Sequence, residues 1–405
     1  MDAKTLVDYA ASLDCIHCGL CVTSCPTWKL TGVESSSPRG RVHLMRAVAE
    51  GELAPNADYV EEMEFCLLCR HCESVCPSGV RFGAMMETAR DAITRKVGRP
   101  LFARILRRLG FRVLLFHPAL LRASATLLRF AQRLRLGPKR APAVPPASER
   151  RPLPERTNAA AARRGAVSVL EGCVMPLLYG RVNRATVAVL ARAGFDVWSP
   201  RGQACCGSLH AHNGDLEGAR TLARRTIAAF EVDEGAVVVN SAGCSAHMKD
   251  YGHLLADDPA WRARAERFAA RVRDFTEFLA GKIEFPRAAG DRGRIAYDDP
   301  CHLCHAQRIR SQPRTLLDAV PGLARVEMRD SEACCGSAGI YSVVRPDASA
   351  AILDPKIAAF LETGATTLVT ANPGCQMQWE AGFARAGVRA RVAHVAEILE
   401  EASRP

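Results

Sequence analysis

The sequence predicts a multidomain α+β protein, in which a mostly helical N-terminal domain precedes two repeated α/β modules with mostly parallel sheets. Three observations lead to this prediction. Two four-cysteine motifs of identical spacing lie near the start of the chain, a basic and then proline-rich segment follows, and the remaining residues form an internal repeat. At 405 residues the chain is long enough for two or three domains with separate cores.

The seventeen cysteines are clustered at motif spacings. The first residues, MDAKTLVDYAASLD, include acidic side chains and lack the apolar run of a secretory signal. We therefore expect a cytoplasmic protein, in which clustered cysteines favour metal or redox chemistry over disulfides. No stretch of the sequence approaches the roughly 20 apolar residues that are needed to cross a bilayer.

The two cysteine motifs are CIHCGLCVTSCP, from Cys15 to Pro26, and CLLCRHCESVCP, from Cys66 to Pro77. Their C-x2-C-x2-C-x3-C-P spacing is typical of two-cluster ferredoxins, in which three thiolates hold one cluster and the fourth ligates the other. We predict two [4Fe–4S] clusters with crossed ligands: Cys15, Cys18, Cys21 and Cys76 for one, and Cys66, Cys69, Cys72 and Cys25 for the other. Zinc is the alternative, but a tetrahedral ion needs only four ligands and leaves half of these cysteines without a role.

Helical stretches at residues 40–53 and 83–97 complete the predicted ferredoxin-type domain, which we place at residues 1–93. A basic segment follows, because residues 94–151 contain fifteen Lys or Arg and one acidic residue. Up to about residue 137, Leu, Phe and Ile recur among the arginines at helical spacing, which predicts one or two basic amphipathic helices. Six prolines at residues 137–156 then predict a linker, so residues 94–163 form the connecting region.

The basic helices have two open interpretations. They can lie on anionic lipid or on an acidic subunit, or they can pack on the protein's own domains. Nucleic acid is not expected as a partner, because the segment has no interleaved aromatic pattern and no known binding motif. Peripheral contact with the inner face of the cytoplasmic membrane therefore stays open beside a purely cytoplasmic location.

The rest of the chain is an internal repeat, with a first module at residues 164–285 and a second at 286–405. Each half begins with a strand that ends near a cysteine, continues through a helix and an extended segment to ACCGS, and then through another helix to a strand ending in Gly-Cys. Corresponding cysteines are offset by 128, 129 and 131 residues. This alternation predicts mostly parallel sheets, whose ligand sites lie at the carboxyl ends of the strands, where these cysteines fall.

The repeated C…CCG…GC pattern resembles the paired cysteine-rich (CCG) domains of heterodisulfide reductases and of iron–sulfur subunits of flavin-linked dehydrogenases. Joined to a two-cluster ferredoxin domain, it resembles the iron–sulfur subunit of bacterial glycolate oxidase, and the stretches SSSPRGRVHLMRA (35–47) and CPSGVRF (76–82) also look like that family. The candidate metal-binding cysteines of the modules are Cys173, Cys205, Cys206 and Cys244 in the first, and Cys301, Cys304, Cys334, Cys335 and Cys375 in the second.

The modules depart from the family pattern at one point. The fuller pattern ends each module in C-x2-C, whereas His247 and Gln378 stand at the last positions here. The first module therefore offers four thiols and His247, while the second has a fifth thiol in Cys304. A further iron–sulfur cluster, a zinc ion and a reactive dithiol all remain open for these modules.

Histidines accompany the cysteines throughout the chain. They are His17 and His71 in the N-terminal motifs, and His210, His212, His302 and His305 in the modules. Each is a candidate for tuning a cluster, binding metal or transferring a proton. Because the placement of a ring cannot be read from a sequence, we expect them in loops exposed to solvent.

No G-x-G-x-x-G after a strand, no Walker loop and no acid–base constellation is present, so we expect no flavin or nicotinamide on this chain and assign no catalytic residue. The resemblance implies partner flavoprotein subunits that oxidise glycolate to glyoxylate, with D-lactate as an open second substrate. It also implies that this subunit passes the electrons to a quinone or another membrane acceptor. The alternatives are the equivalent subunit of anaerobic glycerol-3-phosphate dehydrogenase and an autonomous heterodisulfide-reductase-like enzyme.

Overall fold

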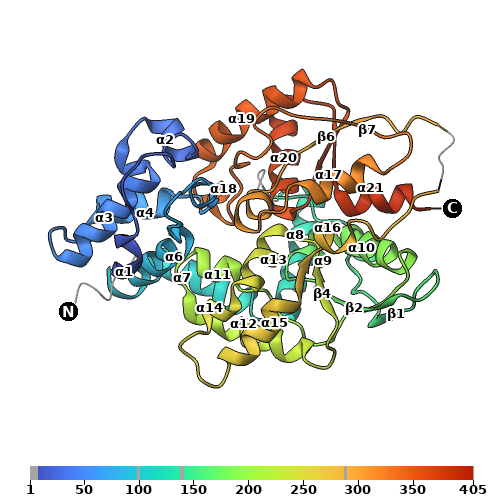
Figure 1. Ribbon diagram of the computed structural model, residues 1–405, viewed down its shortest axis with the longest axis horizontal. Coiled ribbons are helices and arrows are strands. Elements are labelled where there is room, and N and C mark those ends of the chain that lie inside the picture. Colours follow the sequence, from blue (N-terminus) through green and yellow to red (C-terminus); the bar gives the residue numbers. More distant parts are fainter. Residues whose placement is uncertain (1–7, 98–100, 137–140, 287–289, 405) are drawn as a thin grey trace.

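Figure 1 shows the chain as a computed structural model, which describes residues 8–97, 101–136, 141–286 and 290–404. The expectations for the first seven residues, and those for residues 98–100 and 137–140 of the basic and proline-rich segments, lie outside the described residues. The N-terminal domain, blue in Figure 1, lies to one side of the two modules, which form the larger part of the molecule.

The N-terminal domain is helical, as the sequence predicts. Its helices are α1 (Tyr9–Leu13), α2 (Pro26–Thr31), η2 (Glu34–Ser36), α3 (Pro38–Glu50), α4 (Ala57–Phe65), α5 (His71–Ser74) and α6 (Phe82–Ala92). The side chains of Ser37 and Asn56 accept hydrogen bonds from backbone N–H groups at the starts of α3 and α4, and Gly51 ends α3 in the left-handed conformation. Methionine and aliphatic side chains of α3, α4 and α6 form a core against the cysteine loops.

The basic segment forms a series of short helices and one longer helix. They are η3 (Ile93–Val97), α7 (Leu101–Arg107), η4 (Arg108–Leu114) and α8 (Pro118–Arg133). Along α8, Leu121, Ala125 and Leu128 lie about one turn apart and pack with Val144 and Leu177. One side of the predicted amphipathic helix is therefore used against the protein's own first module.

These helices and the residues just after α8 also expose many large apolar side chains. Ten large apolar side chains are 47–77% exposed: Leu101, Phe102, Ile105, Leu106, Leu109, Leu120, Leu127, Phe130, Leu134 and Leu136. We call them the exposed helical patch. Within the described ranges no single helix is long and apolar enough to cross a membrane; residues 104–114 and α8 reach the required length and composition only as a pair, bent by 114°.

The proline-rich stretch is not a free linker where the structure describes it. Val144 and Leu153 are buried, and Leu153 belongs to the main core of the modules. The stretch contains the short helix η5 (Ala147–Arg150) and ends in β1 (Arg156–Thr157), which pairs antiparallel with β3. The predicted linker therefore connects the domains while its apolar residues Val144 and Leu153 pack on the first module.

The two modules have the same sheet topology. The strands of the first are β2 (Gly165–Val169), β3 (Phe195–Trp198), β4 (Ala236–Val239) and β5 (Val272–Asp274), in the order β1-β3-β2-β4-β5. Those of the second are β6 (Arg294–Tyr297), β7 (Ala324–Val326), β8 (Thr367–Thr370) and β9 (Arg391–His394), in the order β7-β6-β8-β9. Apart from β1, all neighbouring strands are parallel, which confirms the predicted fold class.

Helices flank both sheets. The first module has α9 (Met175–Leu178), α10 (Gly180–Arg192), α11 (Ser208–His212), α12 (Leu216–Phe230), α13 (Ala242–Lys249), α14 (Tyr251–Leu254), α15 (Arg262–Arg271) and α16 (Phe275–Leu279). The second has η6 (His302–Ala306), α17 (Ser311–Asp318), α18 (Tyr341–Val344), α19 (Pro346–Glu362), α20 (Pro373–Ala386) and α21 (Val395–Ala402). The two sheets therefore present their cysteine loops from equivalent places in the repeat.

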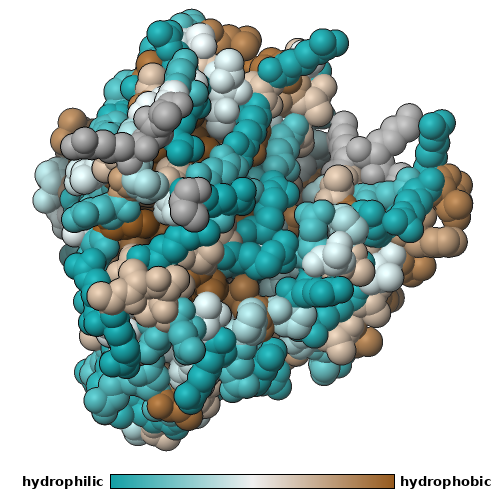
Figure 2. All heavy atoms as spheres, turned by 90° about the vertical axis from the view of Figure 1, so that its right-hand side faces the viewer, coloured by the Kyte–Doolittle hydropathy of each residue, from teal (hydrophilic) through white to brown (hydrophobic). Residues whose placement is uncertain are grey.

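The modules pack on each other through α10 and α21, which lie side by side in Figure 1. Their apolar side chains join one core that extends across both modules. At its edge the guanidinium of Arg181 lies 2.6 Å from a carboxylate oxygen of Glu397. Figure 2 shows the side of the molecule at the right of Figure 1, where the surface is mostly hydrophilic with separate apolar spots.

Candidate metal centres

The two N-terminal cysteine loops share one backbone conformation. His17 and Leu68 occupy equivalent positions in the motifs and have φ angles of 56° and 55°. Gly19 and Arg70, at the next equivalent position, have φ angles of 82° and 61°. Left-handed backbone costs roughly 1–3 kcal/mol at a residue other than glycine and persists only where the surroundings impose it. Both loops therefore turn in the same way around their cysteines.

The thiols of these loops line two cavities. Cys15, Cys18 and Cys21 share the first thiol cavity with Cys76 of the other motif. The second thiol cavity is lined by Cys66, Cys69 and Cys72 together with Cys25. Cys18 is exposed, whereas all four thiols of the second cavity are buried. These are the two groups of the crossed arrangement; which ligand they hold stays a prediction.

Arg41 is a residue of the second thiol cavity that the sequence reasoning missed. Its side chain is completely buried, and Nη1 lies 4.0 Å from the sulfur of Cys25. The guanidinium donates to the carbonyl oxygens of Ser36 and Glu62, both at 2.7 Å, and lies 3.4 Å from the Glu62 carboxylate. An arginine on the buried side of α3, inside the stretch of residues 35–47, is the signal that could have identified it.

Burial favours the neutral, protonated form of these thiols. Burial raises the pKa of Cys21 to about 11 and raises the pKa of Cys66 and Cys72 above their ordinary values. The positive charge of Arg41 acts in the opposite direction on the pKa of Cys66. A metal that binds here as a thiolate complex therefore releases protons, and Arg41 assists that release.

The donors fit an iron–sulfur cluster. Neither cavity has an Asp or Glu among its lining residues in the described part of the chain, and each has an arginine. Thiolates are the usual ligands of such clusters, whereas a single zinc ion needs its donors close around one point. Across residues 8–97, 101–136, 141–286 and 290–404, no three His, Cys, Asp or Glu side chains converge in that way. The cavities therefore suit a cluster whose ligands bind different irons.

The cysteines of each module form a chain of neighbouring thiols, in the same order in both. In the first module the order is Cys173, Cys205, Cys206 and Cys244, and in the second it is Cys301, Cys334, Cys335 and Cys375. The sulfur atoms of Cys335 and Cys375 are 3.2 Å apart. The structure thus brings together, at the carboxyl ends of the strands, eight of the nine cysteines predicted for the modules.

Steric crowding explains why glycine occupies the last position of each CCG triplet. Gly207 and Gly336 have φ angles of 89° and 85°, which favour glycine. A Cβ atom at Gly336 would lie 2.5 Å from the carbonyl oxygen of Ser349, and one at Gly207 would lie 3.1 Å from that of Ala219. The adjacent cysteines can approach the following helix closely only because no side chain intervenes.

Cys304 lies apart from the thiol chain of the second module. Its sulfur is 3.8 Å from the carbonyl oxygen of Cys301, and burial raises its pKa. Cys334 has a different additional neighbour, the thiol of Cys69 in the N-terminal domain. Cys69 and Cys334 are buried in one apolar cluster with Leu67 and Tyr341. The second thiol cavity and the second module are therefore in direct thiol contact.

A buried ion pair distinguishes the second module from the first. Lys356 Nζ lies 2.5 Å from a carboxylate oxygen of Asp298 and donates to the carbonyl oxygens of Ser331 and Ala333. The pKa of Cys335 is lowered chiefly by its interactions with Cys334 and Cys375, and the charge of Lys356 acts in the same direction. In the first module an apolar residue, Leu170, occupies the position of Asp298, so the two thiol chains experience different fields.

Most of the histidines are not in exposed loops, contrary to expectation. His210 is fully buried, and its Nε2 forms a hydrogen bond with the carbonyl oxygen of Phe111, at 2.9 Å. His305 is buried and stacks on His71, with ring centroids 3.8 Å apart. His17 alone of these is exposed, as expected. The expectation failed because the cysteine loops of the modules turn inward, to the contact with the N-terminal domain.

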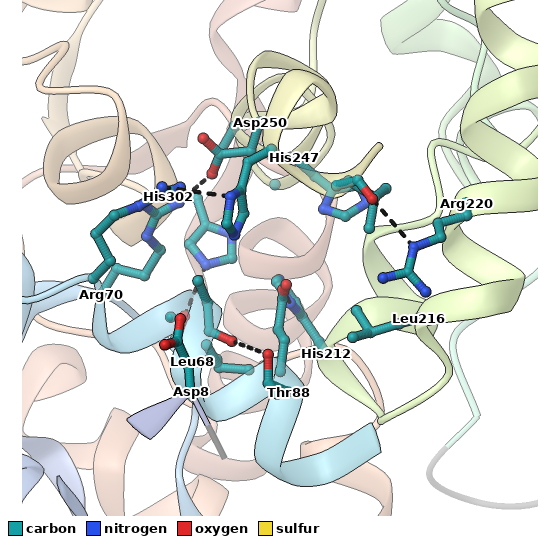
Figure 3. A pocket seen from close by; sticks show the side chains of 18 of the residues that line it. Asp8, Leu68, Arg70, Thr88, His212, Leu216, Arg220, His247, Asp250 and His302 are labelled. Atoms are coloured by element: carbon teal, nitrogen blue, oxygen red, sulfur yellow. Dashed lines mark hydrogen bonds and ion pairs between the residues drawn. The ribbon is translucent and has the colours of Figure 1, made fainter. Parts of the chain in front are cut away.

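A cavity of about 280 Å³ lies where the N-terminal domain meets both modules, and Figure 3 shows the side chains around it. His212, His247 and His302 line it, and burial lowers their pKa values to about 3, 4 and 4. His212 Nδ1 lies 2.7 Å from the carboxylate of Glu87, whose pKa is raised by burial. Burial thus favours a neutral, hydrogen-bonded Glu87–His212 pair. His247, considered as a fifth ligand, is buried with no hydrogen-bond partner for Nε2 among the described residues.

Comparisons with known proteins match the chain in its separate parts. The 4Fe-4S dicluster domain family matches residues 11–80, and the cysteine-rich domain family matches residues 167–249 and 295–380. The probable glycolate oxidase iron–sulfur subunit of Bacillus subtilis is 37% identical over 99% of this chain and 96% of its own length. The glycolate oxidase iron–sulfur subunit of Escherichia coli is 35% identical over 96% of this chain and 93% of its own.

Two further similarities are partial. Lactate utilization protein A of Geobacillus kaustophilus is 34% identical over 58% of this chain and 98% of its own length. The crystal structure of a hypothetical protein from Helicobacter pylori has a TM-score of 0.60 at 8% identity, and the match covers 93% of this chain and 69% of that one. The second similarity is one of fold alone.

Proposed function

The chain belongs to the family of glycolate oxidase iron–sulfur subunits, and from this premise we propose that it transfers electrons within a glycolate dehydrogenase complex. Partner flavoprotein subunits oxidise glycolate to glyoxylate, and this chain passes the electrons singly to a quinone or another membrane acceptor. The observation that carries the proposal is the pair of four-thiol cavities, each built from both motifs. Such a pair suits electron transfer and requires no organic substrate on this chain.

In this proposal Cys15, Cys18, Cys21 and Cys76 hold one [4Fe–4S] cluster, and Cys66, Cys69, Cys72 and Cys25 hold the other. Each cluster, when bound, accepts and releases one electron at a time. The protein's contribution is to supply the thiolates, to exclude water from the second cavity, and to place the charge of Arg41 beside Cys25.

The contact between Cys69 and Cys334 supports an extension of the electron path into the second module. The four-thiol chains of both modules are proposed to hold a further iron–sulfur cluster or a zinc ion. The positive charge of Lys356 favours an anionic thiolate centre in the second module. Loading of that module with iron would continue the path directly from the second thiol cavity.

Peripheral contact with the inner face of the cytoplasmic membrane belongs to the same proposal. The exposed helical patch combines apolar side chains with a segment that carries fifteen basic residues and one acidic residue at positions 94–151. A helix with this composition binds anionic lipid surfaces by burying its apolar side chains and by attraction between its basic side chains and the headgroups. The side of α8 that packs on Leu177 holds the patch to the first module.

The test is anaerobic purification of the chain with its flavoprotein partner, followed by counting of iron, sulfide and zinc. About eight irons correspond to two cubanes, and about twelve to sixteen mean that one or both modules are loaded as well. Addition of glycolate should reduce the flavin and then produce the electron paramagnetic resonance (EPR) signals of reduced clusters. A colourless, zinc-containing chain would refute the proposal.

A variant separates electron transfer from substrate oxidation. Cys18→Ser should abolish reduction of the acceptor while glycolate still reduces the flavin, whereas Ser78→Ala, which changes a residue without a thiol in the same cavity, should behave as the wild type. Intact acceptor reduction in Cys18→Ser would contradict the electron path. Comparison of glycolate with D-lactate in the same assay tests the second substrate, which the partial similarity to lactate utilization protein A supports. Turnover of a disulfide substrate by the isolated chain would instead favour a heterodisulfide-reductase-like enzyme.

A further inference from the structure

A cavity of about 250 Å³ lies between the start of α8 and the first module. Two thiols of the first module, Cys173 and Cys205, line it directly. These thiols are neighbours in the thiol chain of that module, and Cys173 is partly exposed. Whatever redox centre the first module carries is therefore reachable from this cavity, which we call the acceptor cavity.

The walls of the acceptor cavity are largely apolar. They are formed by Leu115, Leu121 and Leu177 and by the prolines at positions 118, 152, 176 and 200. At about 250 Å³ the cavity is slightly smaller than the roughly 300 Å³ at which sites for drug-sized ligands begin. These properties suit one flat, uncharged ring, and any long substituent of that ring would have to leave through the mouth.

The polar groups of the acceptor cavity are mostly hydrogen-bond donors. Arg122 and Arg201 line it, together with Gln203 and one carboxylate, Glu171. Glu171 already accepts a hydrogen bond from the hydroxyl of Ser199, at 3.0 Å, and the Gln203 amide is engaged with Ser199 and Pro200. The guanidinium groups can donate to an oxygen of a ligand, which favours a ring that carries carbonyl groups.

The acceptor cavity lies beside the exposed helical patch. Leu121 faces the cavity, and its neighbour in the chain, Leu120, belongs to the patch. An apolar tail that leaves the cavity along α8 would therefore remain in contact with apolar side chains and, if the patch lies on lipid, with the membrane.

We infer that the acceptor cavity binds the ring of a lipid-soluble quinone, with its carbonyl oxygens toward Arg122 and Arg201 and its tail along the exposed helical patch. This inference rests on the proposed function and adds the site at which the electrons leave the chain. Reduction of the quinone to the quinol converts both C=O groups to C–OH groups, with two electrons from the iron–sulfur centres of the subunit and two protons from water.

The experiment uses the full chain with its clusters, in complex with its flavoprotein, and a benzoquinone that carries a single isoprene unit. Binding is measured by isothermal titration calorimetry, and an azido derivative of the same quinone is photolysed so that mass spectrometry identifies the labelled peptides. Labelling is expected in residues 115–122 or 171–177. Leu121→Trp, which fills the cavity, should weaken binding at least tenfold, and the milder Arg122→Gln should weaken it about threefold to tenfold.

Leu361→Trp is the matched control, since it changes an exposed leucine of α19 that belongs neither to the acceptor cavity nor to the exposed helical patch, and binding should stay within twofold of the wild type. Unchanged affinity in both Leu121→Trp and Arg122→Gln, or labelling confined to the histidine-lined cavity of Figure 3, would overturn the inference. The proposed function is tested separately in the same samples, because glycolate should reduce the clusters without any quinone. Clusters that are reduced by glycolate in a complex that binds no quinone would refute the site and leave the proposed function standing.

Discussion

Replacement of Arg41 by Gln should lower the reduction potential of one cluster and leave the other unchanged. The guanidinium is buried 4.0 Å from the sulfur of Cys25, in the second thiol cavity. Reduction adds negative charge to a cluster, and a nearby positive charge stabilises that form. Removal of the charge therefore makes reduction less favourable, so the potential becomes more negative.

The size of the shift follows from the geometry. Two unit charges 4 Å apart interact by about 4 kcal/mol at an effective dielectric constant of roughly 20. Glu62, 3.4 Å from Arg41, offsets part of the positive charge, and the added electron is spread over the cluster. If a quarter to a half of this interaction energy remains, Arg41→Gln removes about 1–2 kcal/mol of stabilisation from the reduced cluster. This corresponds to about 40–90 mV for a one-electron couple.

The assay is a redox titration followed by EPR spectroscopy, in which the two clusters are resolved. Arg41→Lys keeps the charge and should retain most of the potential, while Arg39→Gln removes a partly exposed arginine from the first thiol cavity and should cause a smaller shift there. Iron content must match that of the wild type in every variant. A potential that rises, or that stays within about 10 mV of the wild type in Arg41→Gln, would refute the reasoning.

Three further predictions concern ligation, pH and lipid. Cys25→Ala should remove the signal of the buried cluster, and Cys76→Ala should remove that of the cluster near the surface, each with a loss of about four irons, although each residue stands in the other cluster's motif. Loss of the opposite signals in iron-counted EPR samples would contradict the crossed arrangement. Burial lowers the pKa of His394 to about 4, so the folded state does not take up the proton that the unfolded state binds below about pH 6.5. The contribution of His394 to the free energy of unfolding should therefore be fully present above that pH and fall by about 1.4 kcal/mol per pH unit below it. Thermal unfolding of His394→Asn should depend less steeply on pH. An equal slope would exclude His394 as the source of the pH dependence. The double variant Leu127→Ser, Phe130→Ser should bind phosphatidylglycerol vesicles at least tenfold more weakly in flotation, because each buried apolar side chain contributes about 1.5–3 kcal/mol, and the equally exposed Val343→Ser should have no effect; equal losses in both would argue against the patch.

The fold class and the repeat could be predicted because their signals are local. The strands that precede the cysteines are short apolar runs, and the offset of the CCG triplets gives the repeat directly. The strands β5 and β9 were not predicted, because residues 272–274 and 391–394 contain no comparable apolar run and pass at once into a helix. Their place at one edge of each sheet is determined by contacts with β4 and β8.

The same contrast between local signals and long-range contacts applies to the candidate metal centres. Spacing within each motif predicts which thiols gather, because the loop itself brings them together. The contact between Cys69 and Cys334 joins residues 265 positions apart and depends on how the N-terminal domain docks on the second module. The burial of His305 against His71 depends on the same docking, and that of His210 depends on Phe111 and Phe116 of the basic segment; no pattern within the neighbouring residues indicates either.

The thiol contact between Cys69 and Cys334 also has a consequence for biogenesis. The second thiol cavity is covered where Leu67 and Cys69 meet Cys334 and Tyr341, all of which are buried. A cluster carrier therefore has to deliver its cargo there before the second module closes over the site. The first thiol cavity, with Cys18 at the surface, stays accessible to the carrier afterwards. Maturation of the chain should thus proceed in a defined order, with the inner cluster first.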